Sequence, residues 1–306
     1  MILVTGSSGL LGANFVLAGL ERRKEMVATF HRNLIRFPGI RNVRMDITDP
    51  GSVGDTVASL RPDWIVHCAA ATSVDWCEDH PDACHQVNGN ATGALASAAR
   101  RQGIPMVYIS TDSVYPGREG DYREDSAPRP VNAYGRSKLA GEAAVKEALE
   151  EYLIVRTNIF GWNLQPKQSL AEWFLGELEA GRQVPGFTDV VFSPLLVNSF
   201  SEILLDLMNA RVSGLFNIGS RDSCSKYEFG RMIAGTFSLD PGLVRPGRLG
   251  ESPLRAPRPF NTTLDIGKIS RTLNRSMPDV RSQVVRFKSL RDEGFPERLR
   301  GYWGGG

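Results

Sequence analysis

Short apolar runs alternate with segments in which apolar residues recur at helical spacing through the first half of the chain. The apolar runs predict strands at residues 2–5, 26–30, 42–45, 64–68, 106–110 and 152–156. The periodic segments predict helices up to about residue 23 and at 52–60, 88–101 and 133–149. Almost continuously apolar strands that alternate with helices are typical of a parallel sheet covered on both faces. The fold class expected is therefore α/β with a doubly wound parallel sheet.

The pattern becomes irregular after residue 156. Helices are expected at 170–180, 200–209 and 227–237 and a strand at 214–218, whereas residues 241–259 hold five prolines and little periodicity. We interpret residues 1–157, together with about 190–212, as the domain that contains the sheet. Residues 158–189 and 213–306 are expected to form a smaller, loop-rich C-terminal domain.

Composition narrows the class of protein. With 306 residues, 42% hydrophobic residues and a formal net charge of +2, the chain can bury a sizeable core and is not expected to be disordered. Its basic residues are scattered, which argues against nucleic acid as a partner. The chain has no apolar stretch near the roughly 18 residues of a membrane span, and Met1 leads directly into the first strand. A cytoplasmic protein that does not use a membrane is expected.

The number of cysteines also favours a cytoplasmic protein. The four cysteines, Cys68, Cys77, Cys84 and Cys224, are too few for a disulfide scaffold, which favours a reducing compartment. Residues 77–85 read Cys-x2-His-x3-Cys-His, and both residue types bind zinc. A structural zinc site generally draws on two separate chelating pairs, and these side chains share one short segment. We expect no metal.

A glycine-rich turn follows the first predicted strand with the spacing G-x-x-G-x-x-G. Glycine allows a tight turn and lets backbone N–H groups approach a diphosphate, while the last glycine lets helix and strand pack closely. This pattern, in an alternating α/β half, predicts a Rossmann-type, NAD(P)-binding domain, so the C-terminal domain would bind substrate. The expected cofactor contacts in this turn are Gly6, Ser8, Gly9, Leu10, Leu11 and Gly12.

The end of the second strand bears on which dinucleotide is bound. NAD sites place an acidic residue there, on the ribose 2′-hydroxyl. Residues 29–32 read Thr-Phe-His-Arg, and His31 or Arg32 could pair with a 2′-phosphate. This favours NADP, with NADPH preferred and NAD still possible; the alternative is that Arg32 is a solvated loop residue. Asp46 and Ile47 are placed to reach the adenine, although Asp46 is also compatible with a simple turn.

Three residues form a candidate catalytic group. Tyr134 and Lys138 lie at i and i+4 and so share one face of a predicted helix. A nearby ammonium group would lower the pKa of the tyrosine and make it a general acid–base. Thr111 follows a predicted strand, at the sheet edge where open α/β proteins place active groups, and its hydroxyl could hydrogen-bond a substrate carbonyl.

The order of these motifs resembles the extended short-chain dehydrogenase/reductase family. The matching pieces are residues 6–12, His-Cys-Ala-Ala at 67–70, Val-Asn at 87–88, Ser-Thr-Asp-Ser-Val-Tyr at 110–115 and Tyr-Gly-Arg-Ser-Lys at 134–138. Within this family the chain is most similar to the dTDP-4-dehydrorhamnose reductases. That similarity rests on residues 110–117, on Ala-Thr-Ser-Val-Asp at 71–75 and on Arg-Pro-x-Asn-Thr-Thr-Leu-Asp at 258–265.

The resemblance implies NADPH-dependent reduction of the 4-keto group of a nucleotide-linked 4-keto-6-deoxy sugar by direct hydride transfer. Tyr134 would protonate the carbonyl oxygen, Lys138 would hold the nicotinamide ribose and lower the pKa of Tyr134, and Thr111 would polarise the carbonyl. Further cofactor contacts would come from Ala69, Ala70, Ala71 and Asn88. Substrate contacts would come from Val74, Asp75, Thr111, Asp112, Asn158, Trp162 and Arg258, although simple packing of Trp162 and a structural role for Arg258 stay open.

One position at which the chain departs from related sequences argues against dehydration and epimerisation. Sugar-nucleotide dehydratases of the family carry Glu, and its epimerase-reductases carry Cys, at the position of Ser113. His67 is interpreted as a packed residue. The alternatives are a reductase or epimerase for another sugar nucleotide, such as a GDP-linked one, and a non-catalytic NADP-binding regulatory subunit like that of methionine adenosyltransferase. A small-molecule nucleotide-sugar partner is expected, and a homodimer is compatible with the sequence.

Overall fold

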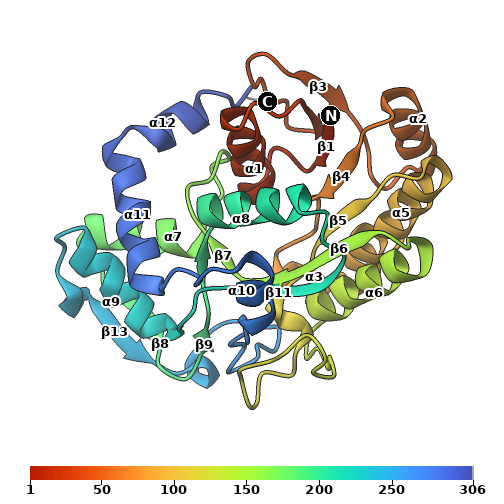
Figure 1. The fold of residues 1–306 in the computed structure, drawn as a ribbon. Coiled ribbons are helices and arrows are strands. Elements are labelled where there is room, and N and C mark those ends of the chain that lie inside the picture. Colours follow the sequence, from red (N-terminus) through yellow and green to blue (C-terminus); the bar gives the residue numbers. More distant parts are fainter. Residues whose placement is uncertain (305–306) are drawn as a thin grey trace.

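A seven-stranded parallel sheet forms the centre of the computed structural model, which describes residues 1–304 (Figure 1). Its order is β11-β6-β5-β4-β1-β2-β3, and every neighbouring pair is parallel. The strands are β1 (Ile2–Thr5), β2 (Met26–Phe30), β3 (Arg41–Arg44), β4 (Trp64–His67), β5 (Met106–Ile109), β6 (Tyr152–Thr157) and β11 (Gly214–Ile218). The order reverses between β1 and β4, so the crevice beyond their carboxyl ends is where such a sheet binds ligands. The expected doubly wound sheet is confirmed.

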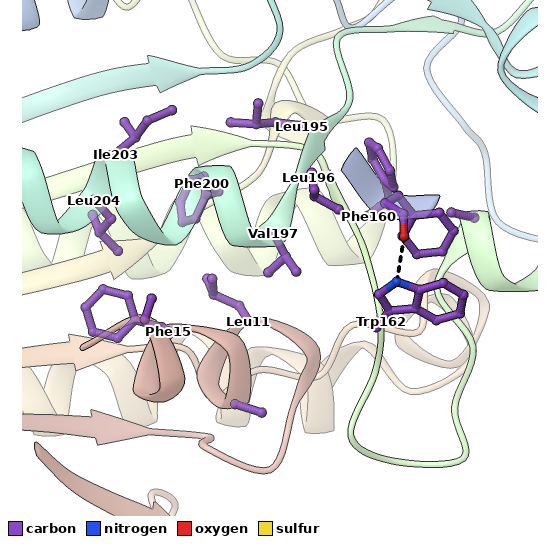
Figure 2. Close-up of a cluster of buried hydrophobic side chains, with 14 of the residues drawn as sticks. Leu11, Phe15, Phe160, Trp162, Leu195, Leu196, Val197, Phe200, Ile203 and Leu204 are labelled. Carbon is purple, nitrogen blue, oxygen red and sulfur yellow. Dashed lines mark hydrogen bonds between the residues drawn. The ribbon is translucent and has the colours of Figure 1, made fainter. Parts of the chain in front are cut away.

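Helices cover both faces of this sheet (Figure 1). One face packs against α1 (Leu10–Glu21) and α8 (Val197–Asn209), and the other against α2 (Pro50–Leu60), α5 (Ala91–Gln102) and α6 (Ala133–Ala148). The strands alternate accordingly, because Ile2 and Val4 join the first core while Leu3 joins the second. Figure 2 shows the first core, where α8 lies across α1.

The rest of the chain forms a smaller part made of short elements. Its strands form three two-stranded sheets, β7 (Ile159–Phe160) with β10 (Leu195–Leu196), β9 (Val191–Phe192) with β12 (Cys224–Ser225), and β8 (Val184–Phe187) with β13 (Val244–Gly247). The helices around them are α7 (Leu170–Glu179), α9 (Lys226–Thr236), α10 (Gly267–Leu273), α11 (Val280–Asp292) and α12 (Phe295–Arg300). Within residues 1–304, no helix combines the length and the apolar character that a membrane crossing requires.

The expected elements are present, with ends that shift by a few residues. A loop and a short helix were expected around residues 76–85, where the structure has two short helices, α3 (Val74–Asp79) and α4 (Pro81–His85). The helices after residue 265 were not predicted from the sequence. These helices are short or largely polar, and α11 buries only Val280, Gln283, Val284 and Phe287. The strand β11 belongs to the central sheet, although it lies in the range 213–306 that we had placed in the substrate domain. The division into two domains stays a prediction.

Candidate active site

The glycine-rich turn joins β1 to α1 at the crevice. Gly6 has a φ of +65°, and a Cβ there would lie 2.6 Å from the backbone of Ala69. A Cβ on Gly12 would lie 2.3 Å from the Gly6 carbonyl oxygen. Gly9 is the N-cap of α1, whose first turn carries neither a side-chain cap nor an acidic residue. This close, uncapped turn fits an anionic diphosphate at the helix N-terminus.

The other residues predicted in this turn contribute mainly backbone. Leu11 is buried in the core shared with α8, so its side chain points away from the crevice (Figure 2). Ser8 and Leu10 are half-buried. The Ser8 carbonyl oxygen accepts a hydrogen bond of 2.8 Å from the side chain of Gln165.

The structure brings together the residues expected to select the dinucleotide. His31 Nε2 lies 3.3 Å from Asp46 Oδ2 at the ends of β2 and β3. Hydrogen bonds from the hydroxyl and backbone N–H of Thr48 lower the pKa of Asp46, and the charges of His31 and Arg32 act in the same direction. Arg32 is exposed, and Ile47 packs at the rim of the second core. A basic pair therefore flanks one carboxylate at this edge.

Asn88 anchors the loop that follows β4. Its side chain accepts from the Ala71 N–H at 2.8 Å and donates to the Ala71 carbonyl at 2.9 Å and to Ser137 Oγ at 3.0 Å. Asn88 is buried in a single π-helical turn, residues Gln86–Asn90, and such turns are frequent at functional sites. Ala69 and Ala70 lie half-buried in the same loop, so Asn88 ties this loop to α6.

Thr111 and Tyr134 share a hydrogen bond beyond the end of β5, and Lys138 follows Tyr134 on α6. Tyr134 and Lys138 lie one turn apart near the start of α6, whose N-cap Asn132 accepts from the Gly135 N–H at 2.8 Å. Lys138 is only 3% exposed, and its Nζ lies 4.1 Å from the centre of the Tyr108 ring. Burial raises the pKa of Tyr134 above its ordinary value, and a hydrogen bond with Thr111 opposes this effect.

Burial also affects the charge of Lys138. Burial lowers the pKa of Lys138 to about 7, although the Glu142 carboxylate favours the charged form. Burial penalises tyrosinate and so raises the pKa of Tyr134. Tyr134 is therefore a protonated acid over the whole neutral range. A lowering of the Tyr134 pKa by the Lys138 ammonium stays a prediction.

Asp112 is the centre of a polar cluster that joins the two parts of the molecule. Its Oδ2 accepts from Asn158 Nδ2 at 2.8 Å and from Thr262 Oγ1 at 2.6 Å. Burial lowers the pKa of Lys226 to about 8, and the charge of Asp112 opposes that shift. The Lys226 ammonium lies 3.1 Å from the centre of the Phe192 ring.

Sequence reasoning placed Asp112 and Asn158 here but missed Thr262 and Lys226. Thr262 lies inside the segment 258–265 that carried the family resemblance, so that segment was the available signal. Lys226 follows the irregular stretch before α9, where no pattern indicated that it comes within the range of the Asp112 charge.

Asp75 and Arg258, both predicted to contact substrate, bind each other. Arg258 Nη2 lies 3.1 Å from Asp75 Oδ1, and Arg258 Nη1 donates to the Ala256 carbonyl at 2.8 Å. Hydrogen bonding from the Ala256 N–H and the charge of Arg258 lower the pKa of Asp75, against the opposing effect of burial. The pair holds the segment 255–258 against α3, which favours the structural alternative for Arg258. Val74 is half-buried at the start of α3.

Trp162 does not lie where the prediction placed it. Its indole stacks on Phe287 with 4.0 Å between ring centres, and its N–H donates to the Phe287 carbonyl at 3.0 Å (Figure 2). The side chain is 4% exposed, because α11 covers it. This placement supports the packing alternative and not a substrate contact.

The last candidates are His67 and the cysteines of residues 77–85, and their side chains are packed inside the protein. His67 is buried between hydroxyls, with Nδ1 2.7 Å from Thr5 Oγ1 and Nε2 3.1 Å from Thr92 Oγ1, and burial lowers the pKa of His67 to about 3. Cys77 and Cys84 are buried beside Tyr134. In the described residues 1–304, no group of three or more His, Cys, Asp or Glu side chains is arranged to hold a metal ion.

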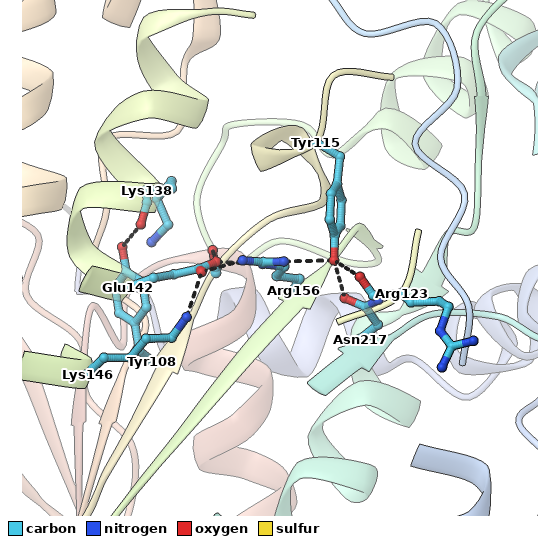
Figure 3. Close-up of polar contacts among 9 residues, drawn as sticks. Tyr108, Tyr115, Arg123, Lys138, Glu142, Lys146, Arg156 and Asn217 are labelled. Atoms are coloured by element: carbon cyan, nitrogen blue, oxygen red, sulfur yellow. Dashed lines mark hydrogen bonds and ion pairs between the residues drawn. The ribbon is translucent and has the colours of Figure 1, made fainter. Parts of the chain in front are cut away.

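A buried ion-pair network includes Glu142, which follows Lys138 by one turn of α6 (Figure 3). The Glu142 carboxylate accepts from Arg156 Nε at 2.8 Å, from Arg156 Nη2 at 2.7 Å and from Ser110 Oγ at 2.6 Å. Arg156 Nη1 donates to the Tyr115 hydroxyl at 2.8 Å, and Tyr115 lies within 3.2 Å of Asn217 Oδ1 on β11. The network links α6, β6 and β11 at the carboxyl edge of the sheet.

Comparison with known proteins places this arrangement in a family. Residues 1–290 match the family model described as the RmlD substrate binding domain. A relative from Haloferax volcanii, the probable low-salt glycan biosynthesis reductase Agl14, is 31% identical over 290 residues, which cover 94% of this chain and 96% of that protein. The methionine adenosyltransferase 2 subunit beta of Bos taurus is 30% identical over 288 residues, covering 88% and 81%.

A solved structure is similar over almost the whole chain. The dTDP-4-dehydrorhamnose reductase of Bacillus anthracis, crystallised in complex with NADP, superposes with a TM-score of 0.83 at 26% identity. The match covers 94% of this chain and 98% of that one. The central sheet, the crevice and the smaller part are therefore shared with a protein of known ligand.

Proposed function

The chain belongs to the RmlD substrate binding domain family, and from this premise we propose that it is an NADPH-dependent oxidoreductase. Its substrate would be a nucleotide-linked 4-keto-6-deoxy sugar, reduced at the 4-keto group as in the dTDP-4-dehydrorhamnose reductases. The observation that carries the proposal is the hydrogen bond between Thr111 and Tyr134, with Lys138 one helical turn further along α6. The Lys138 charge acts on Cys68, which follows β4, the neighbour of the strand that leads into the uncapped glycine turn. The nucleotide-sugar partner and a cytoplasmic location belong to the same proposal, and a homodimer stays a prediction.

The residues present fit a nicotinamide dinucleotide. A Cβ on Gly6 or Gly12 would clash with neighbouring backbone, so these glycines keep the turn tight, and Asn88 holds the 69–71 loop beside it. When bound, this cofactor would supply a hydride to the carbonyl carbon. Tyr134 would donate its phenolic proton to the carbonyl oxygen, which balances the two-electron reduction to an alcohol. Thr111 would hold the carbonyl oxygen by a hydrogen bond, and Lys138 would hold the cofactor ribose.

Turnover is the direct test of this proposal. The purified protein should oxidise NADPH in the presence of a 4-keto-6-deoxy sugar linked to dTDP. A panel with GDP-, UDP- and CDP-linked ketones, followed by absorbance of NADPH, would identify the nucleotide and would detect the alternative of a GDP-linked substrate. Lack of turnover with every ketone, in protein that binds NADPH, would contradict the proposal.

A second function is supported by one comparison. The chain is 30% identical to the methionine adenosyltransferase 2 subunit beta, which is named as a subunit of another enzyme. A non-catalytic NADP-binding subunit would bind NADPH without turnover and would associate with a catalytic partner. The hydrogen bond of Thr111 with Tyr134, and Lys138 one turn further along α6, favour the reductase.

Cofactor preference is expected to depend on Arg32. We expect NADPH to bind more tightly than NADH because the end of β2 is basic, and Arg32→Asp should reverse the order by repelling a 2′-phosphate. Fluorescence titration of both cofactors measures the ratio, and a change of about tenfold corresponds to ~1.4 kcal/mol. Arg100→Asp, at an exposed site on α5, controls for net charge. An unchanged ratio in Arg32→Asp would show that Arg32 is only a solvated residue.

The pH dependence of reduction is expected to follow Lys138. Burial lowers the pKa of Lys138 to about 7, so the ammonium form is present below that pH and is lost as pH rises through it. Because Tyr134 stays protonated in this range, kcat/KM should fall on the alkaline side of neutrality through Lys138 alone. The residual activity of Lys138→Met should lack this fall. The same alkaline fall in Lys138→Met would assign it to another group.

A further inference from the structure

Residues 163–169, which we call the strap, bridge the two loops that border the crevice. Gln165 Nε2 donates to the Ser8 carbonyl of the glycine turn at 2.8 Å. Lys167 Nζ donates to Thr72 Oγ1, just beyond the 69–71 loop, also at 2.8 Å. These loops follow β1 and β4, between which the strand order reverses, so the strap contacts both walls of the ligand crevice.

The two ends of the strap are held by one buried carboxylate. Glu172 Oε1 accepts from the Asn163 N–H at 3.0 Å, and Glu172 Oε2 accepts from the Ser169 N–H at 2.9 Å. Glu172 is 6% exposed and pairs with Arg300 at 3.1 Å. The strap is therefore fixed at both ends, whereas Lys167 and its neighbours in the middle are exposed.

The strap has room to move on its other side. A cavity of about 340 Å³ separates it from α7, α11 and α12, and Gln165, Lys167 and Gln168 are among its lining residues. Leu164 is packed in the core, but residues 166–168 are exposed, so this middle part of the strap can shift at low cost because few buried contacts must be broken.

Charge identifies what the strap would contact. The glycine turn, residues 6–12, contains no basic side chain, yet a dinucleotide would bring two negative phosphates to it. None of the ion pairs within residues 1–304 includes Lys167. Its hydrogen bond to Thr72, beside the loop that follows β4, puts the Lys167 ammonium on the crevice side of the strap.

We propose that the strap closes over the bound dinucleotide and that Lys167 exchanges Thr72 for an oxygen of the cofactor diphosphate. This inference rests on the proposed function in one respect, namely that the crevice binds a nicotinamide dinucleotide. Gln165 then acts as a positioning residue that keeps the strap against the glycine turn.

Binding measurements on the full chain test the proposal without turnover. Calorimetric titration with NADPH and, separately, with dTDP would compare the wild type, Lys167→Met and the control Lys288→Met, whose lysine forms a surface pair on α11. Lys167→Met should bind NADPH about tenfold more weakly, as expected for loss of a charged hydrogen bond, and dTDP should bind unchanged. The difference should shrink with added salt. Gln165→Ala should accelerate NADPH dissociation in stopped-flow measurements.

The outcomes separate this inference from the function on which it rests. Wild-type protein that binds neither NADPH nor NADH would defeat both. Wild-type and Lys167→Met proteins that bind NADPH equally would overturn the strap alone. Weaker binding confined to dTDP would assign Lys167 to the substrate diphosphate and would also overturn the proposal. Thermal unfolding of each variant checks that substitution of these surface residues leaves the fold intact.

Discussion

Tyr134→Phe is expected to lower kcat for carbonyl reduction by at least ~10²-fold, which is the low end of general acid–base contributions. The substitution deletes only the hydroxyl that would protonate the carbonyl oxygen. Because the pKa of Tyr134 is raised by burial, this hydroxyl carries its proton at every pH at which the protein would be assayed. Steady-state oxidation of NADPH measures kcat, and fluorescence titration should show that NADPH still binds.

Two further variants sharpen this prediction. Thr111→Val should cost less than Tyr134→Phe, because it removes a hydrogen bond to the carbonyl and not the proton source. Lys138→Met should reduce turnover strongly and also weaken NADPH binding, since its ammonium is expected to contact the ribose. Near wild-type kcat in Tyr134→Phe would overturn the assignment, and Asp112 would then be the first acid to test, because His67 has no access to the crevice.

Glu142→Gln is expected to lower the free energy of unfolding by about 3–5 kcal/mol, as for other broken buried ion pairs. The carboxylate is fully buried and accepts two hydrogen bonds from Arg156, which is 2% exposed (Figure 3). Glutamine keeps the shape but leaves the Arg156 charge uncompensated, and it presents one N–H₂ group toward these donors. Urea unfolding followed by circular dichroism measures the change.

The double variant Glu142→Leu with Arg156→Met is the matched control. Removal of both charges should recover much of the lost stability, because the desolvation penalty disappears with the pair. Glu177→Gln, which disrupts the exposed pair with Arg182, should change unfolding little. A Glu142→Gln protein as stable as the wild type would mean that water or another group reaches Arg156.

The sequence by itself determined the sheet and the positions of the candidate residues along it. Short apolar strands and periodic helices are local patterns, and in the first half they predicted every strand of the sheet to within a few residues. The glycine spacing and the i, i+4 relation of Tyr134 and Lys138 are also local. A helix necessarily puts that pair on one face, and a turn after β1 necessarily lies at the crevice.

Only the tertiary structure decided which contacts the side chains after residue 157 make. Trp162 looked like a substrate contact, but α11, 125 residues away, stacks Phe287 on it and accepts its N–H. Thr262 lies 150 residues from Asp112 along the chain, yet it donates a hydrogen bond to it, and Lys226 at the start of α9 comes within the range of its charge. The charge of Lys138 also depends on burial, which cannot be read from the spacing of residues along the chain. Such contacts join segments far apart along the chain, so their positions follow from packing and not from any local pattern.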